Sequence, residues 1–159
     1  ALLKAGIGDT PGLVADDREL LRDGPSYSTD TLAELRAEYG ENTRLVMVIG
    51  FDAFLRLTQW HQPARIFEFA HLVVIARPGY GDPLPAPLME LVEHRVVDSV
   101  EELMQRSCGG FLSLELPSLM AISATYIRKR LEAGKSVRYL VPPPVEQAIA
   151  HYGLYQQCE

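Results

Sequence analysis

The chain has 159 residues, of which 47% are hydrophobic and 23% are charged, and this is the composition of an ordinary globular domain. The apolar content is too high for a disordered chain, and no apolar run has the roughly 18 residues of a membrane-spanning helix. The net charge of −6 argues against a broad surface for DNA or RNA. A small phosphate ligand held by a few local cations remains compatible with it.

The predicted elements follow the order of an α/β domain. The chain opens at 1–4 as if a helix were already under way, and Gly6 and Gly8 end it. A short strand can follow at 14–15. Apolar spacing, caps and glycine or proline stops then predict helices at 28–39, 52–57, 63–69, 88–94, 123–133 and 144–152, and strands at 44–50, 71–77 and 111–116. We expect residues 1–159 to form one domain.

Two predicted strands, at 45–49 and 72–76, are near-continuous apolar runs. Such runs are typical of strands buried on both faces of a parallel sheet. Strands that alternate with helices indicate the α/β class. Ligands of parallel sheets bind beyond the carboxyl ends of the strands, so we expect the chemistry at 49–52, 77–79 and 117–128.

The first long strand ends in Ile49 and Gly50, and Asp52 follows. A glycine at a strand end lets the backbone approach a ligand closely. Asp52 begins the next helix, where its carboxylate can cap the helix or accept a hydrogen bond from a hydroxyl or amide of a ligand. Spacing alone leaves both interpretations open.

Aromatic residues occur both before and after this strand in the sequence. Trp60, the only tryptophan, follows a predicted helix and is either a core plug or a stacking surface for a flat ring. Tyr27 and Ser28 begin the predicted helix 28–39. Hydroxyls beside a helix N-terminus form an anion site, although a plain helix start capped by Ser28 or Asp30 explains the same residues.

The segment 121–130 has the densest set of candidate groups. Ser123 is expected to cap a helix, with Arg128, Lys129 and Arg130 crowded into its first half. Because the helix dipole favours cations at the C-terminal end, this placement costs stability unless an anion binds. A capping hydroxyl, free backbone N–H groups and an arginine form a phosphate cradle, and the alternative is a solvated basic face.

The remaining candidates for chemistry are histidines and cysteines. The histidines show no metal-ligand or nucleophile pattern and are interpreted as structural or surface residues. The two cysteines lack metal-like spacing and are interpreted as free thiols of a cytoplasmic protein. No protein-held metal site is predicted. These residues are His61, His71, His94 and His151, with Cys108 and Cys158.

Several segments, in this order, resemble bacterial nicotinate mononucleotide adenylyltransferases, which have the Rossmann-like fold of the nucleotidyltransferase superfamily. They are SYSTDTL at 26–32, IGFD at 49–52 followed by Trp60, AHLVV and RPG within 70–79, ISATYIR at 122–128, and VRYLVP at 137–142. The resemblance covers about 14–155. The ISATYIR motif alone is shared with related nucleotidyltransferases, whereas IGFD with Trp60 and the tyrosine segment narrows the resemblance to pyridine nucleotides.

The resemblance implies transfer of AMP from ATP, with Mg²⁺, to nicotinate mononucleotide, which releases pyrophosphate in NAD biosynthesis. It implies that the acceptor nucleotide is bound by Tyr27, Ser28, Ile49, Gly50, Asp52, Trp60 and Arg77. It implies that ATP is bound by Ile122, Ser123 and Arg128, of which Ser123 and Arg128 are catalytic. In-line attack on the α-phosphorus needs positioning and charge neutralisation rather than a side-chain nucleophile.

One motif of that family does not occur in the 159 residues. The family has a Gly-rich turn and an HxGH motif near its N-terminus, and the first histidine of that motif is its main transition-state contact. We therefore expect this chain to be the C-terminal, larger part of such an enzyme, without a βα unit of about 30 residues. We expect no turnover from these residues alone.

Two other functions stay open from the sequence. One is a different adenylyltransferase of the same superfamily, such as a pantetheine-phosphate type, against which Trp60 and the Tyr27 segment argue. The other is a non-catalytic nucleotide-binding module. The expected partners are small molecules, without nucleic acid or membrane, and a homo-oligomer is left open. The preference for nicotinate over nicotinamide rests on the resemblance alone.

Overall fold

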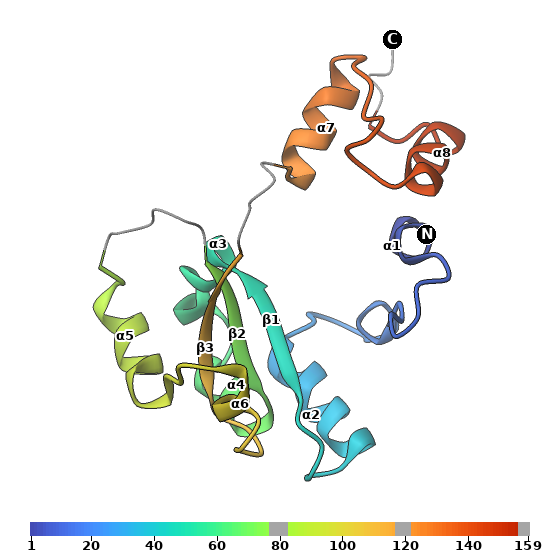
Figure 1. Cartoon of the computed structure of the whole chain (residues 1–159). Helices are drawn as coiled ribbons and strands as arrows, with labels where there is room; N and C mark the ends of the chain where they lie inside the picture. The colour runs from blue at the N-terminus through green and yellow to red at the C-terminus, as the bar shows by residue number, and fades with distance from the viewer. Residues whose placement is uncertain (77–82, 117–121, 156–159) are drawn as a thin grey trace. The chain divides into compact units, whose positions relative to one another are not determined.

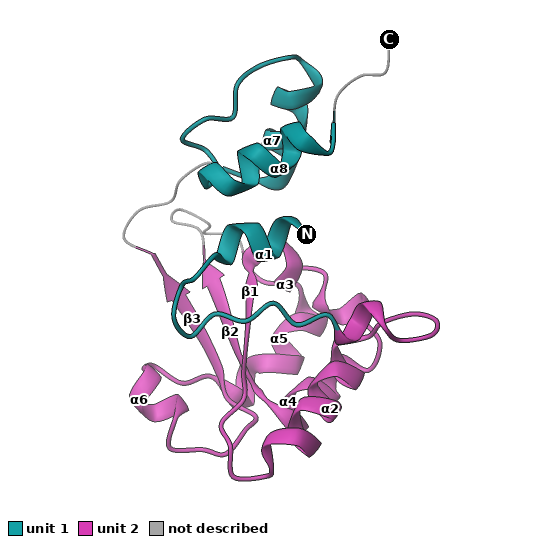
Figure 2. Cartoon of the chain, turned by 90° about the vertical axis from the view of Figure 1, so that its right-hand side faces the viewer, with its two compact units in different colours: residues 1–17, 120–159 teal, residues 18–119 magenta. Residues whose placement is uncertain are grey.

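The computed structural model describes residues 1–76, 83–116 and 122–155 (Figure 1). The chain forms two compact units, one of residues 1–17 and 120–159 and one of residues 18–119 (Figure 2). A single domain over 1–159 stays a prediction, since compact units can also be parts of one domain.

The larger unit is built on a parallel sheet of three strands. β1 (Val46–Gly50), β2 (His71–Ala76) and β3 (Phe111–Glu115) lie side by side in that order. Val48 is in register with Val73, and Val73 with Leu112. Helical segments connect the strands, as parallel pairing requires. The predicted α/β class and its three strands are confirmed.

Two of the four helices expected in the larger unit are shorter than predicted, and the one expected at 88–94 begins two residues earlier, at Ala86. The predicted helix 28–39 is confirmed, whereas 52–57 and 63–69 each divide into a single α-turn and a 3₁₀ turn. Gln62, in the left-handed region at φ 47°, and Pro63 after it interrupt the chain between them. The α-helices are α2 (Ser28–Tyr39), α3 (Phe51–Phe54), α4 (Ile66–Phe69), α5 (Ala86–Val92) and α6 (Val100–Leu103), and the 3₁₀ turns are η1 (Arg18–Leu20), η2 (Leu57–Gln59), η3 (Pro63–Arg65) and η4 (Glu93–Arg95).

Two apolar clusters lie on opposite faces of the sheet, because alternate side chains of a strand point to opposite faces. Leu72 and Val74 belong to the larger cluster, which also includes Phe54, Leu57, Ile66 and Leu88. Val73 of the same strand belongs to the second cluster, with Val97, Leu103 and Leu112. The prediction that the second long strand is buried on both faces is therefore confirmed.

The same prediction for β1 was wrong. Met47 and Ile49 pack against the larger cluster, but Val46 and Val48 are 39% and 59% exposed. The residues of the second cluster come from β2, β3 and the segment 97–103, and none comes from β1. Within the described residues, β1 therefore has one covered face.

His71 connects the start of β2 to the loop before β3. Its ring is fully buried, and Nδ1 accepts a hydrogen bond from the Gly110 N–H at 3.0 Å. Nε2, which must then carry the proton, donates to the Arg106 carbonyl at 3.2 Å. Burial lowers the pKa of His71, the hydrogen bond to Arg106 opposes this, and the charges of Arg106, Arg36 and Arg44 add to it.

The described part of the smaller unit contains the helices α1 (Leu2–Ile7), α7 (Ala124–Glu132) and α8 (Pro143–His151). The predicted helices at both ends of the chain are confirmed to within a residue or two. α1 packs on α8, where Gly6 lies against Val145. The strand expected at 14–15 was wrong, because a two-residue apolar run with Val14 86% exposed has no neighbour to pair with.

In the described ranges, no helix combines the length and the apolarity that crossing a bilayer takes.

Candidate functional site

A pocket of about 290 Å³ lies in the larger unit, between the start of α2 and the residues that follow η2. It brings together Tyr27, Ser28 and Trp60, three residues predicted to bind the acceptor nucleotide. It also brings in three residues that were not predicted. The full lining is Ser26, Tyr27, Ser28, Gln59, Trp60 and His61.

The start of α2 leaves backbone donors beside this pocket. Tyr27 is the N-cap residue with extended backbone, and no side chain makes a capping hydrogen bond there. The prediction that Ser28 or Asp30 caps the helix was therefore wrong. The first-turn N–H groups of a helix carry partial positive charge and need acceptors. An uncapped helix start at a pocket suits an anionic group of a ligand.

Two aromatic rings, those of Tyr27 and His61, form a wall of the pocket. They stack with centroids 4.2 Å apart at an interplanar angle of 25°. This contact joins the start of α2 to the segment after η2. The adjacency of His61 and Gln59 to the predicted Trp60 was the only sequence signal that could have identified them.

The structure confirms the core contact of Trp60, and its role as a stacking surface stays a prediction. Its half-buried side chain packs against the larger apolar cluster, and it also lines the pocket. Because part of the indole is held by the core, the part that faces the pocket has a defined orientation. A rigid aromatic surface of this kind suits stacking on a flat ring.

A second group of predicted residues lies where β1 ends. Gly50 is the N-cap residue of α3 with φ −77°, and no described atom lies within 4 Å of the position a Cβ would take. Neither the backbone angle nor the packing of described residues demands a glycine there. Asp52 is exposed in the first turn of α3, and the half-buried Ile49 packs against the larger cluster.

The ligand positions expected at the strand ends lie only partly within the described residues. Arg77 and the segment 77–79 lie outside the described residues, as does 117–121 of the third position. Ile49, Gly50 and Asp52 are not among the lining residues of the aromatic pocket. The binding roles of all these residues therefore stay predictions.

The candidate nucleotide residues of the smaller unit lie at the start of α7. Ser123 is the N-cap residue, and its Oγ accepts a hydrogen bond from the Tyr126 N–H at 3.1 Å, so the predicted cap is confirmed. Ile122 precedes it and is half-buried. Arg128 is exposed, and its Nη2 donates to Thr125 Oγ1 at 3.3 Å, which directs the guanidinium back toward the first turn.

The expectation that cations crowd the first half of this helix was wrong. Lys129 and Arg130 lie in its last turn, where the helix dipole favours positive charge. Arg130 is also used structurally, because its Nε and Nη2 donate to the Ser136 carbonyl at 3.0 and 2.8 Å. Of the three basic residues, Arg128 alone remains suited to a phosphate at the start of α7.

The three parallel strands and their connecting helices form a Rossmann-like fold. Two solved structures of a nicotinic acid mononucleotide adenylyltransferase from Plasmodium falciparum, complexed with APC and with NaAD, match with TM-scores of 0.54 and 0.55. Each match covers 84% of this chain at 16% identity, and the chain spans 60% and 58% of the two solved chains. At that identity the likeness shows the Rossmann-like fold alone.

The sequence relatives define the family. A probable nicotinate-nucleotide adenylyltransferase from Chromohalobacter salexigens is 59% identical over 98% of this chain, which spans 71% of that relative. Proteins of the same name from Marinobacter nauticus and Halorhodospira halophila are 44% identical over 97% of the chain. A comparison with protein-family models found no match. The chain belongs to the nicotinate-nucleotide adenylyltransferase family.

Proposed function

We propose that the protein transfers AMP from ATP to nicotinate mononucleotide, giving nicotinate adenine dinucleotide and pyrophosphate in NAD biosynthesis. The observation that supports this most is the convergence of Tyr27, Ser28 and Trp60 on one pocket. Trp60 is far in the sequence from the adjacent Tyr27 and Ser28, and the family resemblance assigns all three to the pyridine nucleotide.

The pocket offers complementary groups to the two parts of a nicotinate ring. The indole of Trp60 stacks on the pyridine ring, and the uncapped start of α2 receives the carboxylate. A carboxylate gains more from these N–H groups than a neutral amide does, because it carries a full negative charge. This favours nicotinate over nicotinamide. The Asp52 carboxylate accepts hydrogen bonds from the rest of the acceptor nucleotide. The backbone at Ile49 and Gly50 forms further hydrogen bonds with it.

In this proposal, ATP binds at the start of α7. Ile122 and Ser123 contact the adenine nucleotide, and Arg128 neutralises charge on its phosphates as the acceptor phosphate attacks the α-phosphorus. Because Ser123 Oγ accepts from the Tyr126 N–H, its own hydroxyl proton stays available to a phosphate oxygen. Ser123 and Arg128 are therefore the proposed catalytic residues.

Mg²⁺ enters in this proposal with ATP rather than through a protein site. Among the described residues, no group of three or more histidine, cysteine, aspartate or glutamate side chains could hold a metal ion. No step of the proposal depends on an ion held by the protein.

We further propose that the 159 residues do not turn over by themselves, since they contain no HxGH sequence. They retain the pyridine-nucleotide pocket and should bind nicotinate mononucleotide weakly. The free thiol of Cys108 supports a cytoplasmic location. The proposed partners are the two small-molecule substrates, and a homo-oligomer is compatible with them.

A turnover assay on the native full-length protein tests this function. With nicotinate mononucleotide and Mg-ATP we expect nicotinate adenine dinucleotide. Trp60→Ala and Asp52→Ala should raise the KM for nicotinate mononucleotide and leave that for ATP unchanged, whereas Arg128→Ala should impair the use of ATP. Use of phosphopantetheine instead would favour the pantetheine-phosphate type. Ligand binding without turnover at full length would indicate a binding module.

A further inference from the structure

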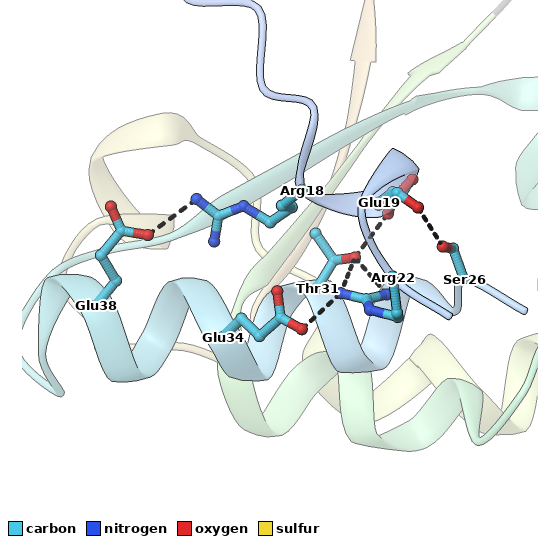
Figure 3. A network of polar contacts seen from close by, with 7 residues as sticks. All are labelled: Arg18, Glu19, Arg22, Ser26, Thr31, Glu34 and Glu38. Atoms are coloured by element: carbon cyan, nitrogen blue, oxygen red, sulfur yellow. Dashed lines mark hydrogen bonds and ion pairs between the residues drawn. The ribbon is translucent and has the colours of Figure 1, made fainter. Parts of the chain in front are cut away.

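A polar network connects the segment before α2 to the first turns of that helix (Figure 3). Thr31 of α2 is its centre. The Thr31 hydroxyl donates to Glu19 Oε1 at 2.6 Å and accepts from Arg22 Nη1 and Nη2 at 3.3 Å. Arg22 Nη2 also donates to Glu34 Oε1 at 2.7 Å, one turn further along α2. A hydroxyl has one proton and two lone pairs, so these contacts use the full capacity of Thr31.

The network closes around the residues that form the aromatic pocket. Ser26, Tyr27 and Ser28 lie in the sequence between Glu19 and Thr31, and all three line the pocket. Ser26 is also tied directly to the network, because its Oγ donates to the Glu19 carbonyl at 3.1 Å. The chain therefore enters the pocket from one clamped point, Glu19, and leaves it at another, Thr31.

The clamp acts through Tyr27. Tyr27 is 37% exposed, and its ring stacks on that of the exposed His61, which is the aromatic contact that holds it among the described residues. Its backbone position is set by the segment that the clamp holds. A shift of about 1 Å at a binding group costs large factors in rate or affinity, whereas an ion pair with a half-exposed partner, as Glu34 is here, contributes less to folding. The network is therefore better suited to geometry than to stability.

We propose that Thr31 is a positioning residue of the pyridine-nucleotide pocket, because its hydroxyl holds Glu19 and Arg22 and so fixes Tyr27 against His61. The inference rests on the proposed function. It adds that affinity for the acceptor nucleotide depends on a hydroxyl that does not line the pocket.

Glu38 offers a matched control on the same helix. It accepts from Arg18 Nη2 at 2.9 Å, and its side chain is 50% exposed, as is that of Glu34. The Arg18–Glu38 pair also joins the segment before α2 to that helix, but it lies one turn further from the pocket than the Arg22–Glu34 pair. A change at Glu38 therefore reports what loss of a surface ion pair does by itself.

The test compares Thr31→Val, Thr31→Ser and Glu38→Gln in the native full-length protein. Thr31→Val keeps the shape and removes the hydroxyl. It should raise the KM for nicotinate mononucleotide about tenfold, with kcat and the KM for ATP within about twofold of the wild type. Thr31→Ser should restore the KM, and Glu38→Gln should leave it unchanged.

Two results would overturn the inference. One is an unchanged KM in Thr31→Val. The other is a parallel rise of both KM values with a large fall in Tm, which would make Thr31 a purely structural residue. A wild type that makes no dinucleotide refutes the proposed function, and titration of nicotinate mononucleotide into wild type and Thr31→Val then decides the inference. Equal affinities, or no binding to either, would overturn it.

Discussion

Gly50→Ala separates folding from substrate binding at the end of β1. The backbone there, at φ −77° and ψ 158°, is open to any residue, and no described atom lies within 4 Å of the new methyl group. At such a position alanine stabilises a fold by about 0.4–1 kcal/mol, because it restricts the unfolded chain. For a chain of this size, the gain corresponds to a rise in Tm of about 1–4 °C.

The ligand should respond in the opposite direction. If the acceptor nucleotide lies against the backbone at Gly50, the methyl group displaces it by about 1 Å, and the KM for nicotinate mononucleotide should rise about 10- to 100-fold. Differential scanning calorimetry and steady-state kinetics on the same preparation measure both effects. An unchanged KM would refute the placement of the ligand at Gly50, and a fall in Tm would refute the open space around it.

The other predictions concern stability. Gly110→Ala should give the opposite pattern to Gly50→Ala, because its methyl group would lie 2.6 Å from Leu103 Cδ1; we expect a loss of about 1–3 kcal/mol by urea unfolding, and a stable variant would contradict the packing. Thr29→Val should be neutral or stabilise by up to about 1 kcal/mol, since within the described chain Thr29 Oγ1 is buried without a hydrogen-bond partner; a clear loss in the same assay would reveal a partner. Because the pKa of His71 is lowered in the folded chain, the unfolded chain binds more protons, so the free energy of unfolding should fall as the pH drops below about 6.5, by up to about 1.4 kcal/mol per pH unit. His71→Asn should remove that part of the slope, and an identical pH profile would refute it.

The sheet and the long helices could be predicted because their signals are local. Apolar runs at 45–49 and 72–76, and the helix from Ser28 to Gly40, show their class within a few residues. Burial is not local. The run at 45–49 resembles that at 72–76, yet of these two strands β2 alone has apolar clusters on both faces among the described residues, since the residues that cover the second face come from 97–103 and 112.

The candidate site shows the same division. Trp60, Tyr27 and Gly50 could be identified by residue type and position. His61 could not, because it lies at the pocket through its stacking contact with Tyr27, 34 positions earlier. α6 was missed although Ser99 and Glu102 have the spacing of a capping box; Ser99 Oγ accepts from the Glu102 N–H at 3.0 Å. The four-residue helix that follows is too short for an apolar period to show.

Trp60 belongs both to the core and to the pocket, and this links the stability of the fold to the binding of the proposed ligand. A core change that loosens the larger apolar cluster also loosens the surface on which the proposed ligand stacks. The converse holds as well, because a ligand that binds to the indole only in the folded chain stabilises the folded state by its binding free energy. A substitution at Phe54 or Leu57, deep in that cluster, is therefore expected to change the affinity for the proposed ligand as well as the stability of the fold.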